Sequence, residues 1–267
     1  MSVLELFNIN SKSNHKKYIN VCAPMVRYSK LPFRELVRGY NVDLTYTPMI
    51  LAKEFKNSNT ARNCEFTTSE SDKPLIIQFA SNNNIDLLKA AELIANYVDG
   101  IDVNCGCPQK WAINEGIGAY LMEKPELVCD MIKTIKMNIP KLPCSIKIRI
   151  HDDMRKTIEF VKRAESIGVD FITNIYQQTG VNGVMSARGL LNNPALFAGY
   201  DFTPWDCIEN FVRLSIAYGT NHFIFHHHLM YMLEDVMSNA EKKSFNTLTS
   251  IPAIIDHLEE HYGLQPE

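Results

Sequence analysis

Residues 100–108 read GIDVNCGCP, a strand-like stretch that leads into two cysteines held between glycine and proline. The first five residues are typical of a buried strand, because apolar and β-branched residues favour strands. Gly106 and Pro108 then end the extended backbone. We therefore expect Cys105 and Cys107 at the carboxyl-terminal edge of a sheet.

The two thiols are either packed in a turn or part of a functional site, and this segment alone leaves both interpretations open. A structural zinc site usually has four ligands, and no second cysteine pair stands at a suitable spacing. We therefore predict no metal here. A cysteine fixed at a strand end is a better candidate for a nucleophile or a proton donor.

Strand-like and helical segments alternate on both sides of this stretch, as in parallel βα units. We predict strands at residues 18–25, 43–49, 75–80, 100–104, 144–150, 169–173 and 182–186, and helices from residues 31, 85, 125 and 158. An open doubly wound sheet would show the same alternation. We favour an α/β fold of the TIM type, a (βα)8 barrel, because polar and reactive residues recur just after the strand ends, where a barrel carries its site.

The last two predicted strands are too close together for a complete barrel. Only eight residues, 174–181, separate Thr173 from Asn182, whereas the earlier strands are about 20 residues or more apart. A parallel crossover needs about a dozen residues or more. We therefore predict an incomplete barrel of seven strands over residues 1–197, internally truncated near residues 173 and 174.

After Pro194 the pattern becomes helical, and Thr203-Pro204 is typical of a helix start. We predict a small all-helical domain over residues 198–267. Three consecutive histidines, 226–228, lie in this part of the chain. Consecutive side chains on a helix point about 100° apart, so three in a row do not converge on one metal ion. We predict a packed or solvated helix face.

Charge is unevenly distributed along the chain. The 267 residues carry a net charge of -3, but residues 1–40 have seven Lys/Arg against two Glu, and residues 203–267 have three Lys/Arg against nine Asp/Glu. Any contact with nucleic acid would therefore be local. Seven cysteines, an odd number, predict reduced thiols and a cytoplasmic or nuclear protein. We expect no signal peptide and no membrane-spanning helix, since no apolar run reaches 18 residues.

Two cations lie on the predicted strand at residues 144–150. Lys147 and Arg149 alternate with isoleucines, so both point to the same side of the strand. In a barrel that side is the interior, where a charge needs a partner such as a bound anion or cofactor. Alternatively, one or both cations lie above the rim in water. The Gly-rich turn around Arg188 follows the last predicted strand, where barrels often bind phosphate.

Taken in chain order, these segments resemble the tRNA-dihydrouridine synthases, and among them the eukaryotic type 4 enzymes, which act on the D-loop of tRNA. The order and spacing of the segments make the resemblance specific, and it runs from about residue 20 to residue 195. The matching segments are Ala23-Pro24-Met25, Gln78, Asn104-Cys105-Gly106-Cys107-Pro108, Gly116-Ile117-Gly118-Ala119, Lys147-Ile148-Arg149, Ala187-Arg188-Gly189-Leu190 and Asn193-Pro194.

The resemblance implies an FMN-binding barrel in which NADPH or NADH reduces the flavin. The reduced flavin then passes hydride to C6 of a uracil in tRNA, and Cys107 protonates C5. A free thiol has a pKa of about 8.5, so it is mostly protonated at neutral pH and can donate. The resemblance implies flavin contacts from Pro24, Met25, Gln78, Lys147, Ala187 and Arg188.

The resemblance also implies contacts with tRNA, and the uridine must leave its stack to enter the barrel. Asn104 would orient the uracil, and Arg149 is a further substrate candidate. Three cations after the first strand are candidates for contacts with the RNA backbone, namely Arg27, Lys30 and Arg34. We expect a monomer with no metal and no membrane contact.

One part of the family pattern is missing. The family carries a His-x-Arg segment after its sixth strand and an Asn-Gly-Asp segment after its seventh, whereas here Thr173 is joined directly to Asn174. We therefore predict weak or absent flavin binding, and exposed strand edges that favour aggregation. A catalytically impaired isoform that acts at most as an RNA-binding or regulatory protein is one alternative. Another FMN barrel oxidoreductase, such as a dihydroorotate dehydrogenase, is a second, which the cysteine motif and the helical tail disfavour.

Overall fold

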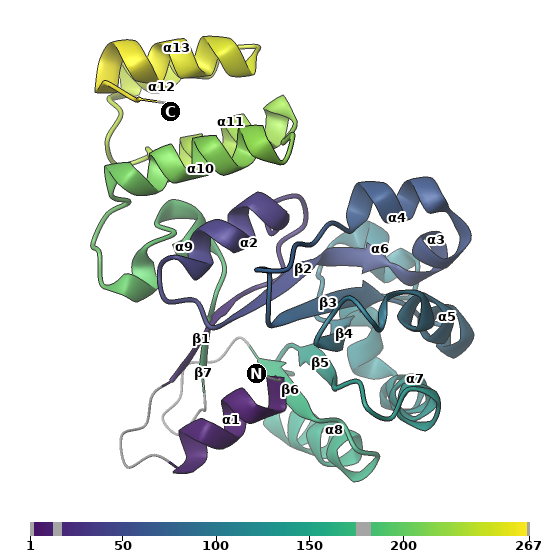
Figure 1. Cartoon of the computed structure of the whole chain (residues 1–267). Coiled ribbons are helices and arrows are strands. Elements are labelled where there is room, and N and C mark those ends of the chain that lie inside the picture. The colour runs from purple at the N-terminus through teal and green to yellow at the C-terminus, as the bar shows by residue number, and fades with distance from the viewer. Residues whose placement is uncertain (1–2, 13–17, 175–182, 266–267) are drawn as a thin grey trace.

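The computed structural model describes residues 3–12, 18–174 and 183–265. Its strands form one parallel sheet in the order β6-β5-β4-β3-β2-β1-β7, which curls into an incomplete barrel (Figure 1). The strands are β1 (Ile19–Cys22), β2 (Leu44–Leu51), β3 (Leu75–Ala80), β4 (Gly100–Cys105), β5 (Cys144–Ile148), β6 (Phe171–Asn174) and β7 (Gly183–Ser186). This sequential order, with the last strand beside the first, is that of a barrel, so the predicted fold class is confirmed and the doubly wound alternative is wrong.

The gap in the barrel lies between β6 and β7. β7 pairs with β1 from Ile19 opposite Gly183 to Cys22 opposite Ser186, whereas the only partner of β6 among the described residues is β5. In a complete barrel of this order the strand beside the first is the eighth, so β7 has the eighth place and the seventh is empty in the described part of the chain. At Gly183 an added Cβ would lie 2.6 Å from the carbonyl oxygen of Ile19, so glycine lets β7 approach β1.

The N-terminal helix α1 (Val3–Lys12) lies beside this gap (Figure 1). Val3 and Leu6 are buried among residues from the first halves of β1, β2 and β3, and Phe171 of β6 and Met185 of β7 pack against the same cluster. The ring of Phe7 lies 5.0 Å from that of Phe171. The sequence analysis predicted no element in this segment, and the helix covers apolar side chains at the open side of the barrel.

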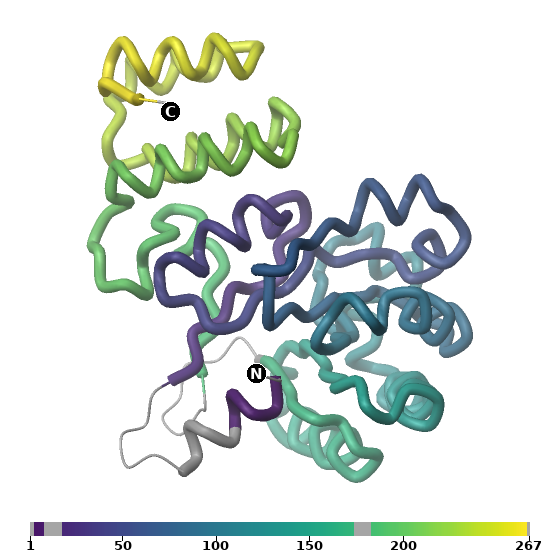
Figure 2. The backbone as a smooth tube through the Cα atoms, in the orientation of Figure 1, coloured from purple at the N-terminus to yellow at the C-terminus, as the bar shows by residue number. Residues whose placement is uncertain are grey.

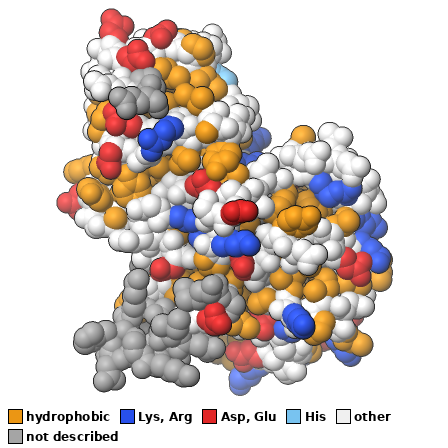
Figure 3. All heavy atoms as spheres, in the orientation of Figure 1, with side chains coloured by type: hydrophobic (Ala, Val, Ile, Leu, Met, Phe, Trp, Pro, Cys, Tyr) orange, Lys and Arg blue, Asp and Glu red, His pale blue; other side chains and the backbone are white. Residues whose placement is uncertain are grey.

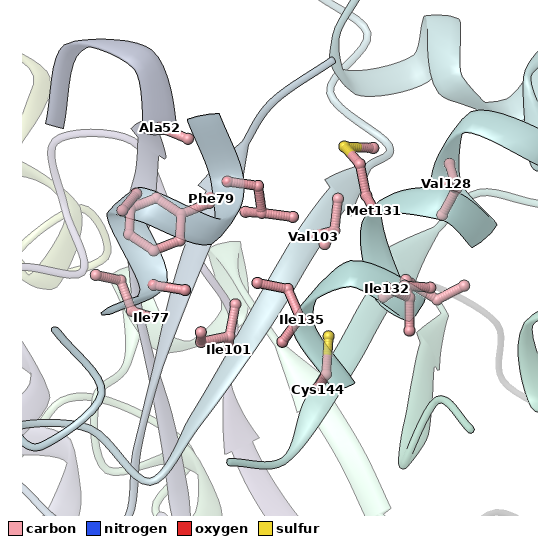
Figure 4. Close-up of a cluster of buried hydrophobic side chains, with 14 of the residues drawn as sticks. Ala52, Ile77, Phe79, Ile101, Val103, Val128, Met131, Ile132, Ile135 and Cys144 are labelled. Carbon is pink, nitrogen blue, oxygen red and sulfur yellow. The ribbon is translucent and has the colours of Figure 1, made fainter. Parts of the chain in front are cut away.

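Helices cover the outer surface of the barrel and bury its main hydrophobic core. Figure 4 shows apolar residues of β3, β4 and β5 facing α7 (Pro125–Asn138), with Ile101, Val103 and Cys144 against Met131 and Ile135. The other helices of the barrel part are α2 (Leu31–Arg38), α3 (Ala52–Asn57), α4 (Asn59–Glu65), α5 (Asn84–Ile94), α6 (Lys110–Asn114), η1 (Gly118–Glu123), α8 (Met154–Ser166), α9 (Arg188–Asn192) and η2 (Leu196–Ala198).

The rest of the chain is helical and stacks on one side of the barrel (Figure 2). It consists of α10 (Trp205–Ala217), α11 (His222–Met232), α12 (Asn239–Phe245) and α13 (Ile251–Tyr262). Its core is continuous with α2 and α9, since Phe33 and Leu190 share one buried cluster with Phe211 and Phe225. Among the described helices none is long and apolar enough to span a bilayer.

Candidate active site

A chain of buried hydrogen bonds runs from the start of β5 through the middle of β4 and β3 to the carboxyl-terminal end of β4. The Gln78 Nε2 atom donates to Asp102 Oδ2 at 2.7 Å, and Asn104 Nδ2 donates to Gln78 Oε1 at 2.8 Å. Asp102 also accepts from Ser145 Oγ at 2.6 Å. At the other end, Asn104 Oδ1 accepts from the backbone amide of Cys107 at 2.9 Å. The network therefore connects the barrel interior to the segment that carries the predicted proton donor.

Two glycines let the neighbouring loop close over Cys107. The amide of Ala119 donates to the carbonyl oxygen of Cys107 at 2.9 Å. Gly118 has φ +64°, and an added Cβ would lie 2.7 Å from that oxygen. Gly116, with φ +71°, also has a conformation that favours glycine. The Gly116-Ile117-Gly118-Ala119 segment is thus the support of the Cys107 loop.

The two cysteines of the motif have different surroundings. Cys105 is fully buried in the outer core, and burial raises the pKa of its thiol well above the usual value. Cys107 is partly exposed and packs, as Met49 of β2 does, against a small cluster of Ala80, Ala112 and Ile117. Of the two, only Cys107 has a thiol that another molecule can reach.

Lys147 and Arg149 occupy different environments. Lys147 is half-buried on β5, where burial lowers its pKa and the nearby Asp102 carboxylate acts in the opposite direction. Arg149 lies after the end of β5 and is exposed. Each of the two predicted locations is therefore occupied by one cation, since Lys147 lies inside the barrel and Arg149 lies at the rim in water.

Asp102 is the only ionisable group of the interior network. Burial raises the pKa of its carboxyl to about 6, while hydrogen bonds from Ser145 and Gln78 and the charge of Lys147 act to lower it. Two further buried hydroxyl groups belong to Tyr46 and Thr173. That of Tyr46 interacts with Ser145 and Thr173, so these groups lie together in the interior close to the end of β6, next to the gap.

The cations that follow β1 differ in their availability to a ligand. The prediction that Arg34 contacts RNA is wrong, because Arg34 is 1% exposed and donates to Asp72 Oδ2 at 2.7 Å. Lys30 is partly buried and bonded to Glu65 at 3.1 Å. Arg27 is exposed and has φ +74°, and its guanidinium lies 5.6 Å from the centre of the Phe223 ring in α11. Of the three predicted contacts, Arg27 is the most available.

The remaining candidates for flavin contacts follow the neighbouring strands β1 and β7, where the amide of Ala23 donates to the carbonyl oxygen of Ser186 at 2.9 Å. Pro24 is half-buried just after β1, and the Met25 side chain is buried in the cluster shared with α2 and the helical part. Ala187 and Arg188 follow β7 and are exposed at the start of α9. The β7 end therefore places a cation at the rim beside the gap.

The three histidines point to different partners, and the packing predicted for this helix is confirmed. His226 Nε2 lies 3.0 Å from the carbonyl oxygen of Phe245, and His228 Nε2 lies 3.2 Å from that of Tyr28. His227 Nδ1 lies 3.1 Å from the hydroxyl of Tyr28. Burial lowers the pKa of His228 to about 3, so it is neutral and joins the helical part to the barrel.

The chain is similar to known proteins of one family. A family model described as dihydrouridine synthase (Dus) matches residues 21–174 and 172–253. The fold and site are those of a barrel oxidoreductase, and the chain belongs to the dihydrouridine synthase family. It is 46% identical to a human "tRNA-dihydrouridine(20a/20b) synthase [NAD(P)+]-like" protein over 92% of each chain. It is 39% identical to the Schizosaccharomyces pombe "tRNA-dihydrouridine(20a/20b) synthase [NAD(P)+]" over 97% of this chain and 91% of the relative.

The same comparisons contain an interruption in the region of the gap. The two family matches meet at residues 172–174, which is the end of β6. The alignment with the human protein spans 290 positions, more than the 267 residues of this chain. The relative therefore has residues without a counterpart here.

Proposed function

We propose that this chain is a tRNA-dihydrouridine synthase that reduces uridine to 5,6-dihydrouridine in the D-loop of tRNA, with FMN as its cofactor and NADPH or NADH as the reductant. The relatives named above, which act on tRNA, support the substrate. The observation that carries the proposal is the position of Cys107. It is held at the end of β4 by Asn104, with the half-buried Lys147 on the neighbouring strand.

The residues of β3, β4 and β5 fit a flavin ring. Gln78 keeps a second amide proton and a second oxygen lone pair beyond its bonds to Asp102 and Asn104, and Lys147 supplies a cation for an electron-rich edge. Bound FMN would supply a hydride to C6 of the uracil. The chain itself supplies the proton, since the S–H bond of Cys107 breaks as a C–H bond forms at C5.

Most of the hydrogen-bonding groups of the Asn104 side chain are already used within the protein. Its Oδ1 atom accepts from the amides of Gly106 and Cys107, and one Nδ2 proton is donated to Gln78. One Nδ2 proton remains, which can be donated to a carbonyl oxygen of the uracil. The same side chain would then set the position of both the base and the acid.

The phosphate side of the site is less complete. Arg188 lies at the end of β7, but the described residues have no strand between β6 and β7 to supply further donors. The buried hydroxyl groups of Tyr46 and Thr173, which interact with each other, belong to the same side of the interior. We therefore propose that FMN binds weakly, because charge-assisted bonds to phosphate supply much of the affinity for such a group.

Absorbance in the visible flavin band of the purified protein, followed by titration with FMN, tests this proposal. Weak but saturable binding, together with dihydrouridine formation in unmodified tRNA under excess FMN and NADPH, is the expected result. Retention of stoichiometric flavin through purification would contradict the weakened phosphate side. No binding at any FMN concentration would remove the enzyme proposal, and tRNA binding without flavin would favour the RNA-binding alternative.

A further inference from the structure

We propose that Asp102 is a positioning residue, which fixes the side-chain amide of Gln78 and, through Asn104, the backbone that presents Cys107. This inference rests on the proposed function, because the position of Cys107 matters for catalysis only if it protonates the uracil. Asp102 itself is fully buried below the rim, so it does not reach the reacting atoms.

The chemistry of the groups along the network permits one arrangement. An ionised carboxylate only accepts hydrogen bonds, so Asp102 requires the Nε2 side of the Gln78 amide. The Oε1 side of Gln78 then faces the end of β4, where it can only accept, and it takes a proton from Asn104 Nδ2. Asn104 Oδ1 is left for the amides of Gly106 and Cys107, at 3.0 and 2.9 Å. The carboxylate at the base and the backbone N–H groups of Gly106 and Cys107 at the other end therefore require the same orientation of the two amides.

The carboxylate is itself held in place. Ser145 Oγ donates to its second oxygen at 2.6 Å from the neighbouring strand, and Asp102 and Ser145 are both 0% exposed. β4 is paired with β3 and β5 on its two sides, so the strand that carries Asp102 and Asn104 has no free edge. The network thus has a fixed base and ends at the one partly exposed thiol of the motif.

The reactivity of Cys107 measures this positioning without flavin or tRNA. The protein is treated with iodoacetamide, and the rate of alkylation at Cys107 is divided by that at the exposed Cys64 by peptide mass spectrometry. We expect Asp102→Ala to raise this ratio by about threefold to tenfold, the factor that corresponds to the net strength of one hydrogen bond. Asp102→Asn should restore the wild-type ratio, because its oxygen can accept from Gln78 and its amide can donate to Ser145.

Ser145→Ala is the matched control, since it removes a buried hydrogen bond to the same carboxylate but leaves the bond to Gln78. The ratio should stay within about twofold of the wild type. A general loosening of the fold would instead expose the buried Cys105, so its alkylation separates the two effects. If Asp102→Ala does not fold, Gln78→Met breaks the network one step later and should raise the ratio in the same way.

Equal ratios in the wild type and in a folded Asp102→Ala or Gln78→Met variant would overturn the inference. A rise that is accompanied by alkylation of Cys105 would overturn it as well, because the role would then be structural. Since neither readout uses FMN or tRNA, a negative result here is distinct from a failure of the proposed function. A loss of flavin binding or of dihydrouridine formation in the wild type would leave the alkylation ratios unchanged.

Discussion

Replacement of Asp102 by asparagine should change how stability depends on pH. Burial raises the pKa of the Asp102 carboxyl from its ordinary value of 3.8 to about 6 in the folded protein. A difference of about 2 pH units corresponds to about 3 kcal/mol between the two protonation states. The folded state therefore binds a proton at Asp102 more tightly than the unfolded chain does.

The direction of the effect follows from this difference. Because the folded-state pKa is the higher one, the stability that Asp102 contributes is fully present below pH 3.8 and is lost as the pH rises through about 6. The unfolding free energy of the wild type, minus that of Asp102→Asn, should therefore rise by about 2 kcal/mol between about pH 7 and pH 4.5. The Asn side chain does not titrate, so all other groups largely cancel in the difference.

Urea denaturation followed by circular dichroism at several pH values between these limits measures the difference. Asp153→Asn is a useful contrast, because Asp153 is the exposed N-cap of α8 and its hydrogen bonds with Arg155 lower its pKa. Its contribution should stay nearly constant over this range, and it should decrease only as the pH falls through 3.8 and below. A wild-type minus Asp102→Asn difference that stays constant over the range, within about 0.5 kcal/mol, would refute the reasoning.

Three further substitutions test other parts of the structure by the same denaturation assay. Gly118→Ala should destabilise the protein by more than the roughly 1–2 kcal/mol that a left-handed backbone conformation costs a residue with a Cβ, because the added Cβ meets the loop after β4. Gly168→Ala is the control: Gly168 has φ +90° and no neighbour within 4 Å, so only the cost of the backbone conformation is expected. Arg34→Met should cost about 3–5 kcal/mol, since it leaves a buried carboxylate with one less partner; a cost under about 1 kcal/mol would show that the ion pair is dispensable. Leu6→Ala should cost about 2–5 kcal/mol if α1 seals the barrel, whereas the exposed Leu4→Ala should have little effect; equal effects would contradict that role for the helix.

Local sequence patterns predicted the strands well and the pairing of distant residues poorly. The strand at residues 75–80 has the bounds that the sequence gives, because LIIQFA is apolar throughout and is bounded by Pro74 and Ser81. Strand alternation would place Cys105 and Cys107 on one face, and their environments differ because β4 ends at Cys105. Arg34 shows the limit of this reasoning, since a cation after a strand looks exposed until Asp72, 38 residues away, is placed beside it.

Two parts of the site depend on long-range packing and could not be predicted from local sequence. The bond between Gln78 and Asp102 joins residues 24 apart, and a buried Asp in the middle of a strand gives no local indication of what it contacts. Helix α1 contains both apolar and polar residues, and its apolar side chains pack against the barrel at the place where β6 and β7 are separated. In both cases, the role of a residue depends on which distant residues it contacts.

The candidate site has two parts, and only one of them adjoins the gap in the barrel. The network beneath Cys107 uses β3, β4 and β5 alone, and each of these strands is paired on both sides. The missing strand position adjoins β6 and β7, where Arg188, the proposed phosphate contact, lies. We therefore expect the absence of that strand to weaken retention of the proposed cofactor while Cys107 keeps its geometry, because hydrogen bonds and strand pairing act over short distances. It follows that excess FMN should compensate for the weaker cofactor binding caused by the gap more effectively than any change near Cys107. Cofactor affinity and proton transfer should also respond to separate sets of substitutions.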